Sequence, residues 1–153
     1  MVHEYANELA RRGDSVVVVY SPGLLLPEGL PPTASARAKY AAARLLRLAR
    51  MRGADWAPLI PAVKVIESLR VPEVPIGPGD VVIATAVQTM PHAARLSAAA
   101  GAHGVALIQG YEEWSASSEF VESAWRLPLF RIVVSPWLAA KGRDMGVETH
   151  LLR

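Results

Sequence analysis

One stretch of the sequence, residues 80–114, constrains the fold more than any other. Its two apolar runs, residues 81–84 and 105–108, do not alternate polar with apolar side chains, which is typical of parallel strands buried on both faces. Two such strands joined by one helix form a βαβ unit, and open α/β sheets bind ligands at the carboxyl ends of their strands. A functional site is therefore expected just after residues 84 and 108.

The helix between these two strands is predicted at residues 90–100. Thr89 offers a hydroxyl that can cap free N–H groups, and Pro91 fits the first helical turn. Gly101 is a stop signal because glycine readily adopts the left-handed conformation that ends helices.

The rest of the chain repeats the same pattern of elements. Apolar residues at helical spacing predict a first helix that is ended by Gly13, and the pair Ser135 and Pro136 starts a late helix. Residues 62–69 fit either a short strand or a helix. Further buried-type strands are predicted at residues 16–20, 131–134 and 147–152. The order predicts an α/β fold, a Rossmann-like, doubly wound and mostly parallel sheet, in a single domain over residues 1–153.

Composition narrows the function classes. The 153 residues include no cysteine, and the four histidines are scattered, so we expect no metal site. No dinucleotide or phosphate-loop motif is present, and we expect no cofactor. The net charge of +2 is too small to indicate nucleic-acid binding. No apolar run approaches the roughly 20 residues of a membrane span, and the start does not resemble a signal peptide, so we expect a cytoplasmic location.

A basic segment interrupts this pattern at residues 34–52. It is rich in alanine and leucine, contains no acidic residue, and includes Arg37, Arg44, Arg47 and Arg50. One interpretation is a solvated helix that packs on the sheet by its apolar stripe. The other is a basic amphipathic helix that lies on an anionic membrane surface, which would place the protein at the inner face of the membrane, or that holds phosphates.

The loop after residue 108 is the most informative candidate site. It combines aromatic rings, which can cover the apolar faces of a pyranose, with carboxylates, which accept hydrogen bonds from sugar hydroxyls. The alternative is a surface loop whose two aromatic side chains pack back on the core. The candidate substrate-binding residues at this edge of the sheet are Thr85, Gln109, Gly110, Tyr111, Glu113 and Trp114, with Glu112 as a candidate catalytic residue.

His92 is a second candidate catalytic residue. It falls in the first turn of the helix that follows Thr85, close to the expected active edge. Imidazole titrates near neutral pH, so His92 could act as a general base. The alternative is a partly exposed helix residue without a chemical role.

Four segments, taken in order, resemble the N-terminal domain of the retaining nucleotide-sugar glycosyltransferases with the GT-B fold. They are residues 2–16 (VHEYANELARRGDSV), 80–85 (DVVIAT), 108–112 (IQGYE) and 133–138 (VVSPWL). The Gln-x-Tyr-Glu element is most similar to the bacterial rhamnosyltransferase-like branch. Asp14 departs from the pattern, because the family commonly has histidine there.

The resemblance implies transfer of a sugar from a nucleoside diphosphate sugar to a glycan or lipid-linked acceptor, with retention. It implies acceptor contacts from Thr85, Gln109, Tyr111, Glu112 and His92. It also implies that this chain lacks the family's first strand and its second, donor-binding domain, so we expect the isolated chain to be inactive. The alternatives are a truncated non-catalytic interaction or ligand-binding module and a different GT-B-type enzyme such as a nucleotide-sugar epimerase.

The absent first strand has a consequence for assembly. In the family it lies between the strands that match residues 16–20 and 81–85. Without it, two apolar strands have open edges, and open edges recruit partners. We therefore expect a homo-oligomer or a rearranged sheet.

Overall fold

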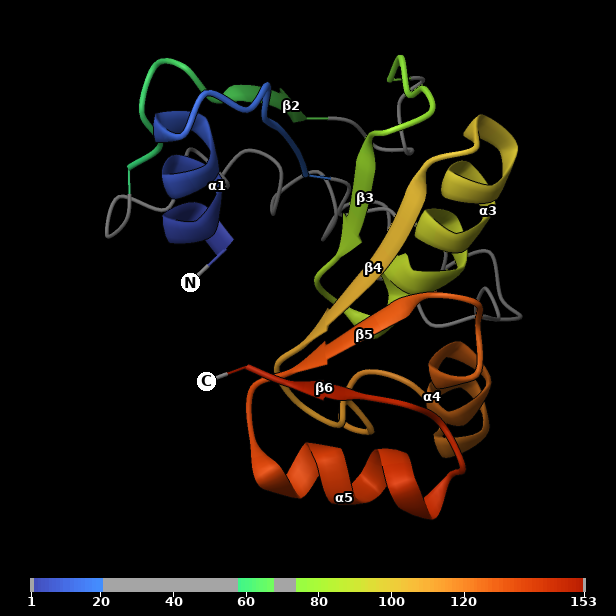
Figure 1. Ribbon diagram of the computed structural model, residues 1–153. Helices are drawn as coiled ribbons and strands as arrows, with labels where there is room; N and C mark the ends of the chain where they lie inside the picture. The colour runs from blue at the N-terminus through green and yellow to red at the C-terminus, as the bar shows by residue number, and fades with distance from the viewer. Residues whose placement is uncertain (1, 21–57, 68–73, 153) are drawn as a thin grey trace, which may run out of the picture. The chain divides into compact units, whose positions relative to one another are not determined.

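The structure, a computed structural model, describes residues 2–20, 58–67 and 74–152 (Figure 1). Its contacts divide the chain into two compact units, Met1–Pro72 and Glu73–Arg153, and each is described by itself. Each contains a parallel sheet, and helices alternate with strands in the second, which confirms the predicted Rossmann-like α/β class. The single domain stays a prediction. The basic segment 34–52, with Arg37, Arg44, Arg47 and Arg50, lies outside the described residues.

The first unit contains helix α1 (Val2–Arg11) and strands β1 (Val17–Tyr20) and β2 (Lys64–Glu67). The two strands pair in parallel, so the segment that fitted either a strand or a helix is a strand. Gly13 has a φ of 98°, the left-handed conformation expected after the helix.

Buried polar side chains tie α1 to the rest of the first unit. The Asn7 side chain donates to the carbonyl of Pro58 at 3.0 Å and accepts from the N–H of Ile60 at 2.9 Å. His3 hydrogen bonds with the hydroxyl of Tyr20 at the end of β1. These contacts satisfy polar groups that would otherwise be costly to bury.

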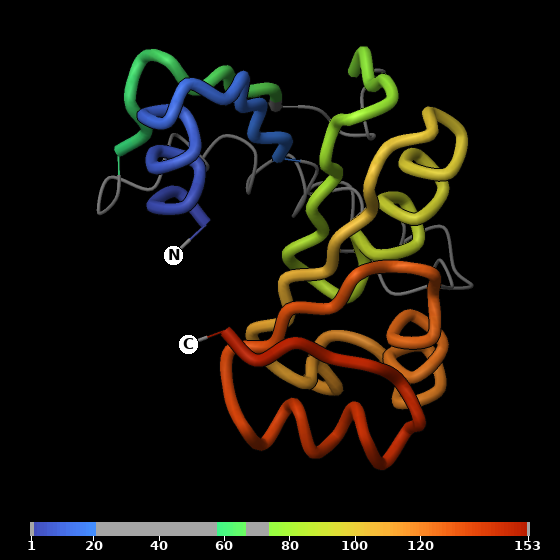
Figure 2. The backbone as a smooth tube through the Cα atoms, viewed as in Figure 1, coloured from blue at the N-terminus to red at the C-terminus, as the bar shows by residue number. Residues whose placement is uncertain are grey.

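The second unit is a four-stranded parallel sheet in the order β3-β4-β5-β6. Its strands are β3 (Val81–Ala84), β4 (His103–Ile108), β5 (Phe130–Val133) and β6 (His150–Leu151). Successive strands are joined by η2 (Val87–Thr89) and α3 (Met90–Ala100), by α4 (Ser118–Trp125), and by α5 (Pro136–Asp144). Figure 2 shows that the chain passes through a helix after each of the strands β3, β4 and β5 before it enters the next strand.

Most helix ends follow the sequence signals. Helix α3 spans the predicted residues and stops at Gly101, whose φ is 64°. Ser135 caps α5 by accepting from the N–H of Leu138 at 3.3 Å. Thr89 does not act as a cap, because its hydroxyl donates to the carbonyl of Ala86 at 2.6 Å and so closes the short turn η2. No helix among the described residues is long and apolar enough to cross a membrane.

The core of the second unit lies on one face of its sheet. Alternate strand positions Ala84, Ala106, Ile108 and Val133 are buried together with side chains from all three helices. The helix residues in this cluster are Met90, Ala93, Ala94, Val121, Ala124, Trp125 and Leu138. Helices α3, α4 and α5 therefore all contribute to one continuous apolar layer against this face.

The opposite face of the sheet is partly exposed. Val81, Ile83 and Phe130 are 55%, 46% and 51% exposed, and Ile83 and Phe130 both lie beside Val105 in the strand register. The expectation that these apolar strands are buried on both faces is therefore wrong at β3. Strand β5 begins one residue earlier than predicted, at the exposed Phe130. Strand β3 is an edge strand of this four-stranded sheet.

We expect this chain to self-associate, because exposed apolar side chains on an edge strand favour pairing with another copy. Ile83→Lys places a charge on the exposed face of β3 and should shift the protein toward monomer. Sedimentation velocity over a concentration series measures this shift. Ala99→Lys, on the exposed side of α3, is the matched control and should leave the association unchanged. A wild-type protein that is monomeric throughout the series would contradict the prediction.

Candidate functional site

Two loops at the carboxyl edge of the four-stranded sheet are joined by hydrogen bonds. The loop after β3 contains Thr85, which is half-buried, and the N–H of Val87, which donates to the carboxylate of Glu112 at 3.2 Å. The buried Gln88 amide donates to the carbonyl and the hydroxyl of Ser115, at 3.2 and 2.8 Å. The ends of β3 and β4 are thus brought together, as the sequence predicts for a parallel sheet.

Glu112 has a structural contact in this arrangement. Its carboxylate accepts from a buried backbone N–H and is itself half-buried. Burial raises the pKa of this carboxyl, and the hydrogen bonds from Val87 and Ser115 offset part of that rise. Glu112 does not pair with Arg131, because the Arg131 guanidinium donates to the carbonyls of Trp125 and Leu127 at the end of α4.

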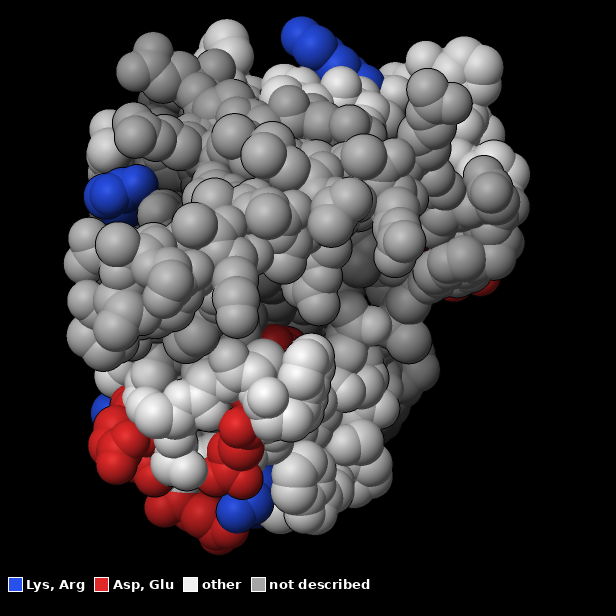
Figure 3. Space-filling view, turned by 180° about the vertical axis from the view of Figure 1, so that it is seen from behind, with Lys and Arg blue, Asp and Glu red and all other residues white. Residues whose placement is uncertain are grey.

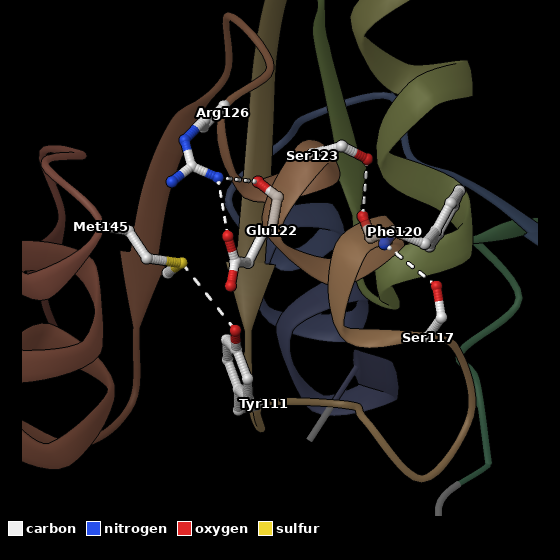
Figure 4. A network of polar contacts seen from close by, with 7 residues as sticks. All are labelled: Tyr111, Ser117, Phe120, Glu122, Ser123, Arg126 and Met145. Carbon is white, nitrogen blue, oxygen red and sulfur yellow. Dashed lines mark hydrogen bonds and ion pairs between the residues drawn. The ribbon is translucent and has the colours of Figure 1, made fainter.

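Tyr111 packs back on the core, as one of the two interpretations of this loop expects. Its ring meets the buried Trp125 edge-on at 5.6 Å and Trp137 at 6.3 Å between centroids. Its hydroxyl donates to the sulfur of Met145, and Figure 4 shows this contact reaching from the loop toward α5. The ammonium of Lys141 lies 5.2 Å from the ring centroid. Tyr111 is therefore held from several sides, which leaves little of its ring for a ligand.

Acidic side chains surround this loop and α4. The loop and α4 together contain Glu112, Glu113, Glu119 and Glu122. Figure 3 shows acidic side chains gathered at one end of the face that it presents. Burial, followed by the charges of Glu122 and Glu113, raises the pKa of Tyr111, so its phenol stays protonated and can donate. Glu122 pairs with Arg126 at 3.2 Å, which Figure 4 also shows.

The remaining loop residues face outward. Trp114 is 85% exposed, which makes the packed interpretation wrong for this side chain although it holds for Tyr111. Gln109 is exposed, and a Cβ added at Gly110 would meet nothing within 4 Å, so the backbone there is open to approach. Glu113 accepts from the hydroxyl of Ser118 at 2.9 Å and so fixes the start of α4.

His92 lies in the first turn of α3, where the sequence places it. Arg95 donates to its Nδ1 at 3.1 Å. Since arginine can only donate, Nδ1 must accept, and the neutral ring carries its proton on Nε2. Burial and then the charge of Arg95 lower the pKa of His92, which keeps the ring neutral at physiological pH. This arrangement occupies the nitrogen that could take up a proton, which weakens the case for a general base.

Two residues near this edge were not among the predicted site residues. Trp137, at the start of α5, is 56% exposed, and the Lys141 ammonium lies 6.0 Å from its ring centroid. Trp137, Lys141 and Met145 are spaced by four residues, so they share one side of α5, and all three contact Tyr111. That helical spacing is visible in the sequence, but nothing in the sequence indicates that this side meets Tyr111.

No family model, curated protein or solved structure matches this chain. The features of this chain that bear on its function are the geometry of this edge of the sheet and the resemblance carried by the four sequence segments.

Proposed function

We propose that this chain is the acceptor-side domain of a retaining glycosyltransferase. In this proposal a nucleoside diphosphate sugar is the donor, and a glycan or lipid-linked sugar is the acceptor. The observation that carries the proposal is a pair of exposed indoles, Trp114 after β4 and Trp137 after β5, at the ligand-binding edge of a parallel sheet. Exposed aromatic faces beside polar loop groups are what a pyranose needs, because its C–H faces are apolar and its hydroxyls are polar.

The contacts at this edge of the sheet separate the residues that hold the loop in place from those that are open to a ligand. Glu112 and Tyr111 hold the loop against α3, α4 and α5, while Trp114, Gln109 and Gly110 are left to meet the acceptor. Thr85 lies at the end of β3 beside the same pair of loops. In this proposal Glu112 acts first by positioning the loop and second as a proton acceptor.

Trp114→Ala tests this proposal. We expect sugar affinity to fall by about tenfold or more, taking as a guide the roughly 1–3 kcal/mol that stacking of a nucleic-acid base on an aromatic side chain contributes. Because Trp114 is almost fully exposed, thermal stability should be nearly unchanged. Calorimetric titration with a panel of oligosaccharides measures the affinity.

Phe130→Ala is the matched control. Phe130 is also an exposed aromatic residue, but it lies at the amino end of β5, on the edge of the sheet opposite to the loops. Its replacement should leave sugar affinity unchanged. If Trp114→Ala and Phe130→Ala have the same effect, or if the wild-type chain binds no saccharide of the panel, the proposal fails and a non-carbohydrate module becomes the better description.

A further inference from the structure

The side of α5 that contacts Tyr111 carries a lysine, Lys141, whose charge has no acidic partner among the residues that the structure describes. The ion pairs among the described residues involve Glu8, Glu122 and Glu148, and none of them includes Lys141. Of the two acids in the loop itself, Glu112 accepts from the N–H of Val87 and Glu113 accepts from the hydroxyl of Ser118. The Lys141 ammonium instead lies over the rings of Tyr111 and Trp137, at 5.2 and 6.0 Å from their centroids.

These rings fix the position of the charge without neutralising it. A cation–π contact attracts the ammonium toward an aromatic face, but it leaves N–H groups free to donate to an anion. The lysine is half-buried, so it is less mobile than a fully exposed lysine. Trp137, four residues earlier on α5, presents an exposed indole beside it. An aromatic face and a held cation thus occupy adjacent positions at the carboxyl edge of the sheet.

We infer that Trp137 and Lys141 form a subsite for a sugar that carries an anionic group, either a carboxylate or a phosphate. The pyranose stacks on the exposed indole of Trp137, and its anionic substituent accepts hydrogen bonds from the Lys141 ammonium. Charge-assisted hydrogen bonds of this kind are stronger than neutral ones. The inference rests on the proposed function, and it narrows the acceptor from any glycan to one with an acidic sugar or a sugar phosphate.

The test compares three probes that share one ring: glucose, glucuronic acid and glucose 6-phosphate. Binding is followed by NMR of the tryptophan indole N–H groups, with the Trp137 signal identified by its loss in Trp137→Ala. We expect at least one anionic probe to bind about tenfold or more tightly than glucose, with perturbation of the Trp137 signal. The ratio between glucuronic acid and glucose 6-phosphate shows whether a carboxylate or a phosphate is preferred.

Lys141→Met removes the charge at nearly constant length and should abolish the preference for the anionic probe, while Lys141→Arg should retain it. Arg143→Met removes an exposed positive charge from the same helix and is the matched control. It should leave the preference unchanged. Thermal unfolding of each variant shows whether it is folded.

Equal binding of all three probes by the wild-type chain would overturn this inference and leave the proposed function standing. A preference that survives in folded Lys141→Met, or that is lost equally in Arg143→Met, would also overturn it, because the charge would then not act at this site. Absence of binding to any probe or longer saccharide would count against both proposals.

Discussion

Gly104→Ala is expected to lower the free energy of unfolding by about 1–3 kcal/mol, the usual cost of overpacking a well-filled core. A Cβ at this position of β4 would lie 2.6 Å from Leu129 Cδ2, 2.6 Å from Ser97 Oγ and 3.3 Å from Ser97 Cβ. The Ser97 hydroxyl can rotate, but its Cβ is fixed on α3, and Leu129 is buried in the core. The added methyl group therefore has to push α3 away from the sheet or move Leu129 off its rotamer.

Urea unfolding measures the effect, and Gly110→Ala is the matched control. Gly110 has no positive φ and has open space where its Cβ would lie, so its replacement should change stability by no more than about 0.5 kcal/mol. The comparison separates close packing at Gly104 from a general cost of replacing glycine. Equal unfolding free energies for Gly104→Ala and Gly110→Ala would show that α3 does not press on β4 as described.

The sequence was sufficient to predict the elements that have strong local signals. Helix α3 begins and ends as predicted because a proline near its start and a glycine at its end restrict the backbone directly. Strand β4 is two residues longer than the predicted 105–108, because it begins at His103. Neither His103 nor Gly104 is a residue type that indicates a strand. Pairing with β3, in which His103 lies opposite Val81, extends this strand, and such a long-range contact is not visible in local sequence.

The candidate site was only partly predictable, for a different physical reason. Strand ends and loop composition were enough to place Glu112, Tyr111 and Trp114 together. They could not show that Tyr111 turns inward to Trp125 while Trp114 turns outward. An irregular loop lacks the regular spacing by which the sequence of a helix or strand reveals which side chains are buried. The role of Lys141 depends on which side of α5 meets that loop, which only tertiary packing decides.

Glu112→Ala is expected to lower the free energy of unfolding by about 1–3 kcal/mol, because it leaves the N–H of Val87 without its acceptor. Val87 is almost fully buried, so water cannot readily replace the lost oxygen. Glu112→Gln keeps an oxygen at the same place and should cost much less. Urea unfolding of both variants gives the difference, and Glu113→Gln, an exposed carboxylate in the same loop, serves as the control.

The pH dependence of these variants tests the burial of the Glu112 carboxyl independently. Since burial raises the pKa of Glu112 above 4.5 in the folded state, the folded protein holds this proton more tightly than the unfolded chain. The stabilisation that this proton provides is complete when the pH is below the pKa of Glu112 in the unfolded chain. It is lost as the pH rises through the pKa of Glu112 in the folded protein. Wild type should therefore lose stability relative to Glu112→Gln as the pH rises above 4.5 and through the raised pKa of Glu112. The prediction fails if the difference in unfolding free energy between wild type and Glu112→Gln is the same at every pH and if Glu112→Ala is as stable as wild type. Glu112 would then have no role in stabilising the fold. Its carboxylate would then be free for the acceptor, which is the role that the sequence resemblance implies.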